Sequence, residues 1–127
     1  MKKFSLLFKE LLGEFLGVLA LIQVGGFLVL NSEVHGVKLV SVALAHGLVL
    51  GIFVFYVGNF GGAHFNPAVT LAMLITGNQN IVEGILYIIS QCLGSICGAG
   101  ILKLMKTSNF GAAASDLGYP SLASGVS

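Results

Sequence analysis

The chain has 127 residues, of which 56% are hydrophobic and only 9% are charged, and its mean hydropathy is +0.98. Soluble domains carry about 25% charged residues, so this composition excludes an ordinary water-soluble globule and a disordered chain. The net charge is +1 and all six basic residues are lysines, which leaves no basic patch for binding a nucleic acid. The composition therefore predicts an integral, multi-pass membrane protein embedded in a lipid bilayer.

Three long stretches of the chain are apolar enough to cross a membrane. Runs of 18, 44 and 19 residues carry no charged side chain, and they lie between Glu14 and Glu33, Lys38 and Glu83, and Glu83 and Lys103. A membrane-spanning helix needs about 20 mostly apolar residues. The sequence therefore predicts three transmembrane helices, at about 11–30, 39–57 and 82–102.

The orientation is only weakly indicated. Lys2, Lys3 and Lys9 precede the first predicted span and favour a cytoplasmic N-terminus. Three spans would then leave the C-terminal segment on the opposite side. This segment, 107–127, is rich in Gly, Ala and Ser, and we expect a polar loop or tail there.

The uncharged segment 58–77 does not fit a simple span. It contains the pair Gly61-Gly62, and Asn66 followed by Pro67 is typical of a helix start, because Asn caps well and Pro suits the first helical position. With Gly77 as a natural stop, the predicted helix covers 67–76. Ten residues make about 15 Å of helix, which is half of the ~30 Å hydrocarbon core. We therefore expect a re-entrant half-helix.

A half-length helix that follows an irregular loop implies a cavity. The reason is that loop backbone at membrane depth must be buried in protein or line a water-filled space. The helix N-terminus would face that cavity with the positive end of its dipole and repel cations. The Asn66 side chain would cap the helix with its oxygen and present its NH₂ group to the cavity. This arrangement suits neutral, hydrogen-bonding solutes such as water.

Four segments of the chain together resemble the aquaporin (major intrinsic protein) family. They are Glu14-Phe15-Leu16-Gly17, Ala43-Leu44-Ala45-His46-Gly47, Gly61-Gly62-Ala63-His64-Phe65-Asn66-Pro67-Ala68-Val69-Thr70, and Tyr87-Ile88-Ile89-Ser90-Gln91-Cys92-Leu93-Gly94. The resemblance covers about 9–106. It implies an all-α membrane fold with a six-helix channel built from two inverted halves, each with three spans and one half-helix. Residues 1–106 resemble the N-terminal half, and the second Asn-Pro-Ala motif and the family's filter Arg are not in this sequence.

The resemblance also implies roles for individual residues. Asn66 would donate a hydrogen bond to passing water at the centre of the pore. Pro67 would fix the helix start, and Ala68 would permit close contact with the partner half-helix. The backbone carbonyls of the loop would form the acceptor ladder of the pore, and the loop residues are Gly61, Gly62, Ala63 and His64.

His46 stands where the family places one wall of its narrow constriction, and His is found there in members resembling plant tonoplast channels. Its ring would line the filter, whereas the alternative is a buried helix histidine bonded to a nearby carbonyl. Glu14 would accept hydrogen bonds from the backbone of the re-entrant loop, and Gln91 would belong to the same buried network. The His64 side chain would hold the loop in place rather than titrate.

Two further patterns concern packing and chemistry. Glycine pairs four residues apart permit close helix contacts, and each predicted span holds one: Gly13/Gly17, Gly47/Gly51 and Gly94/Gly98. Glu14, His46 and His64 are the only plausible polar constellation, with no activated nucleophile and no metal-ligand spacing. We therefore expect neither an enzyme, nor a bound metal, nor a cofactor.

The expected function is that of half a passive channel, which passes water and small neutral solutes such as glycerol or ammonia. Three arrangements stay open. The chain could need a second half-channel, could form an antiparallel homodimer, or could be a non-conducting module that assembles with full-length channels. A small transporter of inverted halves also uses broken helices, but it would need coupling-ion ligands that this sequence scarcely offers.

Overall fold

Each of the three predicted spans forms one continuous helix. The computed structural model describes the backbone of residues 3–35 and 38–109, and this part of the chain is helical with no strand. The helices are α1 (Phe4–His35), α2 (Leu39–Val57), α3 (Pro67–Ile75) and α4 (Ile81–Asn109). Three of them can cross a membrane, over Phe4–Val29, Leu39–Val57 and Ile81–Met105. The prediction of an all-α membrane protein with three spans is confirmed.

The boundaries differ from the predicted ones at two places. The first span begins at Phe4 rather than near residue 11, because the charge of Glu10 is buried within the protein instead of marking the end of the apolar segment. Helix α4 continues to Asn109, past the predicted boundary at 106. The rest of the predicted tail, 110–127, lies outside the described residues.

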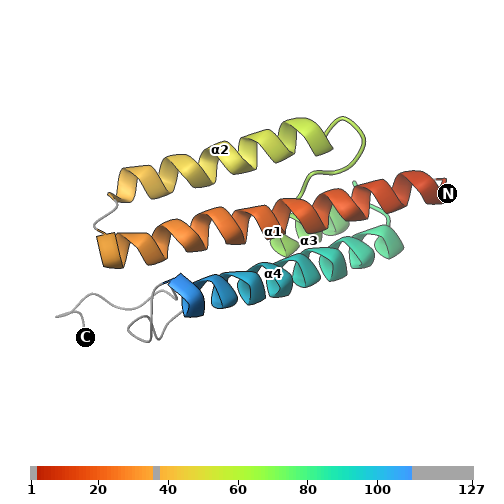
Figure 1. Cartoon of the computed structure of the whole chain (residues 1–127). Helices are drawn as coiled ribbons and strands as arrows, with labels where there is room; N and C mark the ends of the chain where they lie inside the picture. The colour runs from red at the N-terminus through yellow and green to blue at the C-terminus, as the bar shows by residue number, and fades with distance from the viewer. Residues whose placement is uncertain (1–2, 36–37, 110–127) are drawn as a thin grey trace, which may run out of the picture.

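Helix α1 lies between its two long neighbours (Figure 1). It packs against α4 on one side and against α2 on the other, and the short α3 packs against α4. Helices α1 and α4 run in the same direction and α2 runs in the opposite one (Figure 1). Within the described ranges α2 contacts neither α3 nor α4, so one side of α2 is left uncovered.

Glycines set the distance between α1 and its neighbours. A Cβ atom added at Gly94 would clash with the backbone carbonyl of Phe15, and one added at Gly13 would lie 2.8 Å from Cγ1 of Val57. By contrast, Gly47 and Gly51 have nothing within 4 Å of the added atom. Within the part of the chain that the structure describes, the glycine pairs of α1 and α4 thus meet neighbouring segments closely, whereas Gly47 and Gly51 of α2 face open space.

The interior contains both apolar and polar side chains. Val18, Val57 and Phe65 form a small apolar cluster that joins α1, the end of α2 and the loop before α3. Most large apolar side chains are exposed instead, as expected for a protein that meets lipid or a partner. The buried polar residues are Glu10, Glu14, His64, Thr70 and Gln91.

Two helix starts carry a side-chain cap, and the cap at Asn66 is the one that the sequence predicts. Asn66 Oδ1 accepts a hydrogen bond from Ala68 N at 2.8 Å, and Pro67 occupies the first turn of α3. Asn80 Oδ1 accepts from Val82 N at 2.9 Å at the start of α4. Gly77, with φ of 73°, adopts the left-handed conformation just after α3. Helix α3 has nine residues, or about 14 Å, so it is a half-length helix.

Candidate functional site

The loop between α2 and α3 carries the residues expected to line a pore, and its backbone is strained. Ala63 and Phe65 have φ of 50° and 49°, in the left-handed region that residues with a Cβ atom rarely adopt. Such a conformation costs about 1–3 kcal/mol per residue and persists only where surrounding structure enforces it. His64 lies between these two residues, so the contacts of His64 and Phe65 show what holds the loop.

Glu14 enforces this loop conformation directly. Its Oε1 accepts a hydrogen bond from the backbone N–H of His64 at 2.7 Å, and its Oε2 accepts from Phe65 N at 2.7 Å. Oε2 also accepts from Nε2 of Gln91 on α4 at 2.8 Å. Glu14 is fully buried, and a buried carboxylate is tolerated when strong donors surround it. The carboxylate therefore ties α1, α4 and the loop together.

Thr70 links the first turn of α3 to the same network. Its hydroxyl is fully buried and lies 3.1 Å from Nδ1 of His64, and it accepts from Nε2 of Gln91 at 3.0 Å. It also donates to the carbonyl of Asn66 at 3.3 Å. The His64 ring thus points toward α3 and α4, where its Nδ1 contacts Thr70 and its ring lies against Tyr87. The start of α3 and the end of the loop form one hydrogen-bonded unit.

This unit lies at half the depth of the spanning helices. Gly17 is near the middle of the span Phe4–Val29, and the ring of Phe65 packs directly against it. Gln91 is near the middle of the span Ile81–Met105. Asn66 follows Phe65 in the chain, so the start of α3 lies near the midplane of a membrane that these helices cross.

The Asn-Pro-Ala residues lie on the open side of this unit. Asn66, Pro67 and Ala68 are all exposed. Because Oδ1 of Asn66 caps α3, its Nδ2 group is the free end of the side chain, and it has no protein partner among the described residues. The structure thus presents an NH₂ donor at mid-depth, at the N-terminus of a half-length helix. Gly62 is exposed as well, whereas Gly61 and Ala63 are half-buried.

His46 lies apart from this unit, on the face of α2 that meets α1. Its Nδ1 is 2.9 Å from the carbonyl of Val42, and its Nε2 packs directly against Gly25. Gly25 is eight residues beyond Gly17, which corresponds to about 12 Å along α1. His46 therefore occupies a different level of the membrane from Asn66, and its ring remains half-buried.

Two residues that hold the start of the loop, one on α1 and one on α4, were not recognised from the sequence. Tyr87 and Glu10 are both buried, and the Tyr87 hydroxyl donates to Oε2 of Glu10 at 2.9 Å while accepting from Gly62 N at 3.1 Å. Glu10 precedes Glu14 by four residues, and this spacing places both on one helix face. That spacing was the signal that could have identified Glu10.

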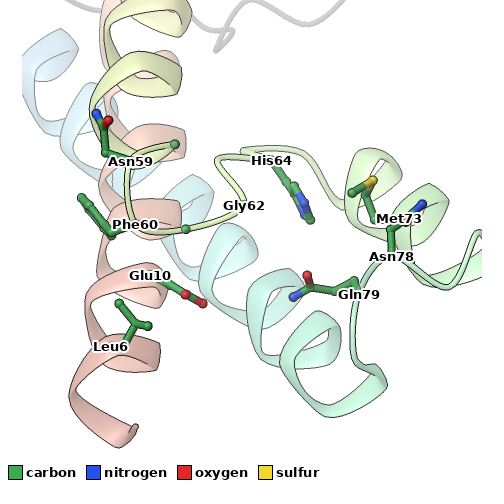
Figure 2. Close-up of a pocket in the computed structure, with 11 residues that line it drawn as sticks. Leu6, Glu10, Asn59, Phe60, Gly62, His64, Met73, Asn78 and Gln79 are labelled. Atoms are coloured by element: carbon green, nitrogen blue, oxygen red, sulfur yellow. The ribbon is translucent and has the colours of Figure 1, made fainter. Parts of the chain in front are cut away.

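A pocket of about 600 Å³ opens beside the loop at this end of the bundle. Its walls come from α1, the loop and the turn before α4, and they include Glu10, Asn59, His64 and Gln79. In Figure 2, Glu10 and Gln79 enter the pocket from opposite sides and point toward one another. In the described ranges, no three His, Cys, Asp or Glu side chains cluster closely enough to hold a metal ion.

Comparison with known proteins agrees with this geometry. The family model described as Major intrinsic protein matches residues 1–127. The chain belongs to the major intrinsic protein family. It is 39% identical over 101 residues to Aquaporin-4 of Mus musculus, which covers 76% of this chain and 31% of that protein. It is 30% identical over 121 residues to Aquaporin PIP2-1 of Arabidopsis thaliana, covering 87% of this chain and 42% of that protein.

The resemblance noted in the sequence is therefore confirmed, as is an integral, multi-pass membrane protein. The chain spans less than half the length of these major intrinsic protein relatives.

Proposed function

We propose that residues 1–106 form one half of a passive channel for water and small neutral solutes. The observation that carries this proposal is the position of Asn66. Its NH₂ group is exposed at mid-depth, at the N-terminus of α3, on a loop that the buried Glu14 holds in a strained shape. Irregular backbone at membrane depth needs hydrogen-bond partners for its polar groups, and a file of water beside the loop would supply them.

In this proposal a solute moves by exchanging hydrogen bonds. The Asn66 NH₂ group donates to the solute oxygen at the centre, and the carbonyl groups of 61–63 accept hydrogen bonds along the loop. The positive end of the α3 dipole disfavours cations at the same place. Solutes that are neutral and hydrogen-bonding cross at the lowest cost, because a charged solute would lose its hydration without compensation.

A pore also needs a wall opposite Asn66, and a second half would supply it. Longer relatives support this requirement, since this chain matches less than half of Aquaporin-4. The uncovered side of α2, with Gly47 and Gly51 open to approach, gives such a half a surface to pack against. The second half is either a separate or continuing chain, or a second copy inserted in the opposite direction. In that homodimer Val69 would replace the Arg of the family's filter.

His46 is the residue of this half that would select among solutes. Its ring lies beside Gly25, about 12 Å along α1 from Gly17, and this level fits a constriction at one end of a pore rather than at its centre. An imidazole ring there narrows the passage and offers a polar edge. We expect water to pass, and glycerol or ammonia to depend on the width that His46 leaves.

Osmotic shrinkage of liposomes, followed by stopped-flow light scattering, tests the proposal. The chain is reconstituted alone and together with a complementary half from an intact homologue. We expect fast shrinkage in at least one case, and a strong change with Asn66→Asp, which keeps the capping oxygen but replaces the NH₂ donor. Asn80→Asp makes the same change at the cap of α4 and serves as the matched control.

Each result has a direct meaning. Fast shrinkage by the chain alone, altered by Asn66→Asp only, favours the antiparallel homodimer. Fast shrinkage that needs the complementary half favours an obligate half-channel. Shrinkage no faster than that of empty liposomes in both cases, from inserted protein, contradicts the channel. Co-purification with an intact homologue would then favour the non-conducting module.

A further inference from the structure

The loop before α3 is anchored at two places. Glu14 anchors only its second part. Glu14 binds the backbone N–H groups of His64 and Phe65. The first half is held by Tyr87 on α4, whose hydroxyl accepts a hydrogen bond from Gly62 N at 3.1 Å. Tyr87 in turn donates to Oε2 of Glu10 at 2.9 Å. The chain Glu10–Tyr87–Gly62 is therefore a second, separate anchor.

The chemistry of a hydroxyl group explains why Glu10 matters in this chain. A tyrosine hydroxyl has a single hydrogen and must place it on an acceptor. Oε2 of Glu10 is that acceptor, so Glu10 fixes the direction of the Tyr87 O–H bond. A lone pair of the hydroxyl oxygen then faces Gly62 N–H and accepts its hydrogen bond. Without an acceptor at residue 10, this hydroxyl loses its preferred rotation and competes poorly for the Gly62 donor.

Packing places the loop backbone directly on these two side chains. A Cβ atom at Gly61 would lie 3.0 Å from Cγ of Glu10, and one at Gly62 would lie 3.0 Å from Cε2 of Tyr87. The ring of Tyr87 also lies against that of His64, with 5.2 Å between the ring centroids. Figure 2 shows Glu10 reaching from α1 into the pocket beside the loop. Because Gly61 and Gly62 lack a Cβ atom, the loop backbone packs directly against side chains of α1 and α4.

The burial of Glu10 indicates that its oxygen atoms are needed. Glu10 is 1% exposed, and it shares one helix face with the equally buried Glu14. Two carboxylates one turn apart in a low-dielectric interior are unfavourable unless each is compensated. An apolar side chain would fill the same space at lower cost. The Tyr87 hydroxyl is one of the donors that compensate the buried Glu10 carboxylate, and this bond orients Tyr87.

We propose that Glu10 is a positioning residue that acts through Tyr87 to fix Gly62. It thereby sets the position of the first part of the loop before α3. This proposal deepens the function proposed above, and only its consequence for permeation rests on that function. Loss of the anchor would let the carbonyl groups of 61–63 move out of register with the solute. The Glu14 anchor would stay in place, so the fold would persist.

Amide hydrogen exchange on the full chain in lipid nanodiscs tests this inference, with resolution at single amides. Tyr87→Phe removes the hydroxyl, and Glu10→Met keeps the volume but removes the acceptor. We expect each to speed the exchange of the Gly62 amide about tenfold, the scale set by one buried hydrogen bond. His64 and Phe65 should stay as protected as in the unmodified chain.

Two more variants separate positioning from simple packing. Glu10→Gln retains an acceptor oxygen, so it should restore most of the Gly62 protection that Glu10→Met loses. The double variant Glu10→Met/Tyr87→Phe should exchange no faster than Tyr87→Phe alone, because Glu10 acts through Tyr87. Glu14→Gln is the matched control, and it should expose the His64 and Phe65 amides instead.

The inference is overturned if Gly62 exchanges at the unmodified rate in either Tyr87→Phe or Glu10→Met, or if the two effects add. Should Glu10→Met fail to insert, Glu10→Leu takes its place, because Tyr87→Phe alone tests only the bond from Gly62 N to the Tyr87 hydroxyl. Shrinkage of liposomes that contain the same variants keeps the two proposals apart. A chain without conductance but with the expected exchange pattern would contradict the channel function and support the anchor.

Discussion

The carboxylate of Glu14 and the backbone amide of His64, fifty residues apart in the chain, are joined by a hydrogen bond of 2.7 Å. The other oxygen of the same carboxylate accepts from Phe65 N. One buried side chain of α1 thus fixes two successive peptide groups of the loop, those whose N–H groups belong to His64 and to the left-handed Phe65. The first helix and the re-entrant loop consequently fold as a unit.

Replacement of Glu14 by Gln should destabilise the protein markedly. Oε2 of Glu14 accepts from two donors, Phe65 N and Gln91 Nε2, and an amide NH₂ group in its place would face them with further donors. We expect a loss of about 2–3 kcal/mol in the free energy of unfolding, the range for a buried charge-assisted hydrogen bond lost in this way. Unfolding of the reconstituted chain in SDS, followed by far-UV circular dichroism, measures it.

Glu83→Gln is the control for this prediction. Glu83 lies in the first turn of α4, only partly buried, so the same substitution should change the free energy of unfolding by about 0.5 kcal/mol or less. Equal effects of the two substitutions would show that the Glu14 network does not stabilise the loop.

Local signals in the sequence were sufficient for the helices. The uncharged stretches predicted the three spans, and Asn66-Pro67 predicted the start of α3 together with its side-chain cap. These features depend on residues close together in the chain, so composition and spacing reveal them. The glycine pair Gly47/Gly51 permits a close contact that the described ranges do not fill, because periodicity does not say which helix face has a neighbour.

The anchors of the loop depend on pairs far apart in the chain and were harder to predict. Glu14 was assigned to the loop through the family resemblance, not through any local pattern. Tyr87 and Glu10 were missed because their contact joins α1 to α4, 77 residues apart. The left-handed Ala63 and Phe65 were also unforeseen, since sequence reasoning assigns that conformation to glycine.

The glycines of α4 and α2 should respond in opposite ways to alanine. A Cβ atom at Gly94 would meet the carbonyl of Phe15, so Gly94→Ala must push α1 and α4 apart. Overpacking of this kind costs about 1–3 kcal/mol. Gly47→Ala meets nothing within 4 Å and should be neutral or stabilising, because alanine is the better helix former. Thermal unfolding of the two variants side by side would contradict the helix arrangement if Gly47→Ala were the more damaging.

His46→Ala should widen the range of solutes that a completed pore admits. The ring is held between the Val42 carbonyl and Gly25, so its removal leaves space without displacing a neighbouring helix. We expect uptake of glycerol and larger polyols to rise several-fold, with water permeability little changed. Light scattering of proteoliposomes under polyol gradients measures this. Unchanged polyol uptake by a conducting assembly would remove His46 from the filter.

The most direct test of the whole account is whether water reaches residue 66 at the middle of the membrane. Asn66→Cys is made in a chain whose exposed Cys92 and Cys97 are replaced by alanine, and it is treated in proteoliposomes with a small, water-soluble methanethiosulfonate. Leu48→Cys, near the middle of α2 and 65% exposed on an apolar surface, is the matched control. A channel half predicts rapid labelling at residue 66 and none at residue 48. Equal, negligible labelling at both positions would contradict a water-filled path beside Asn66.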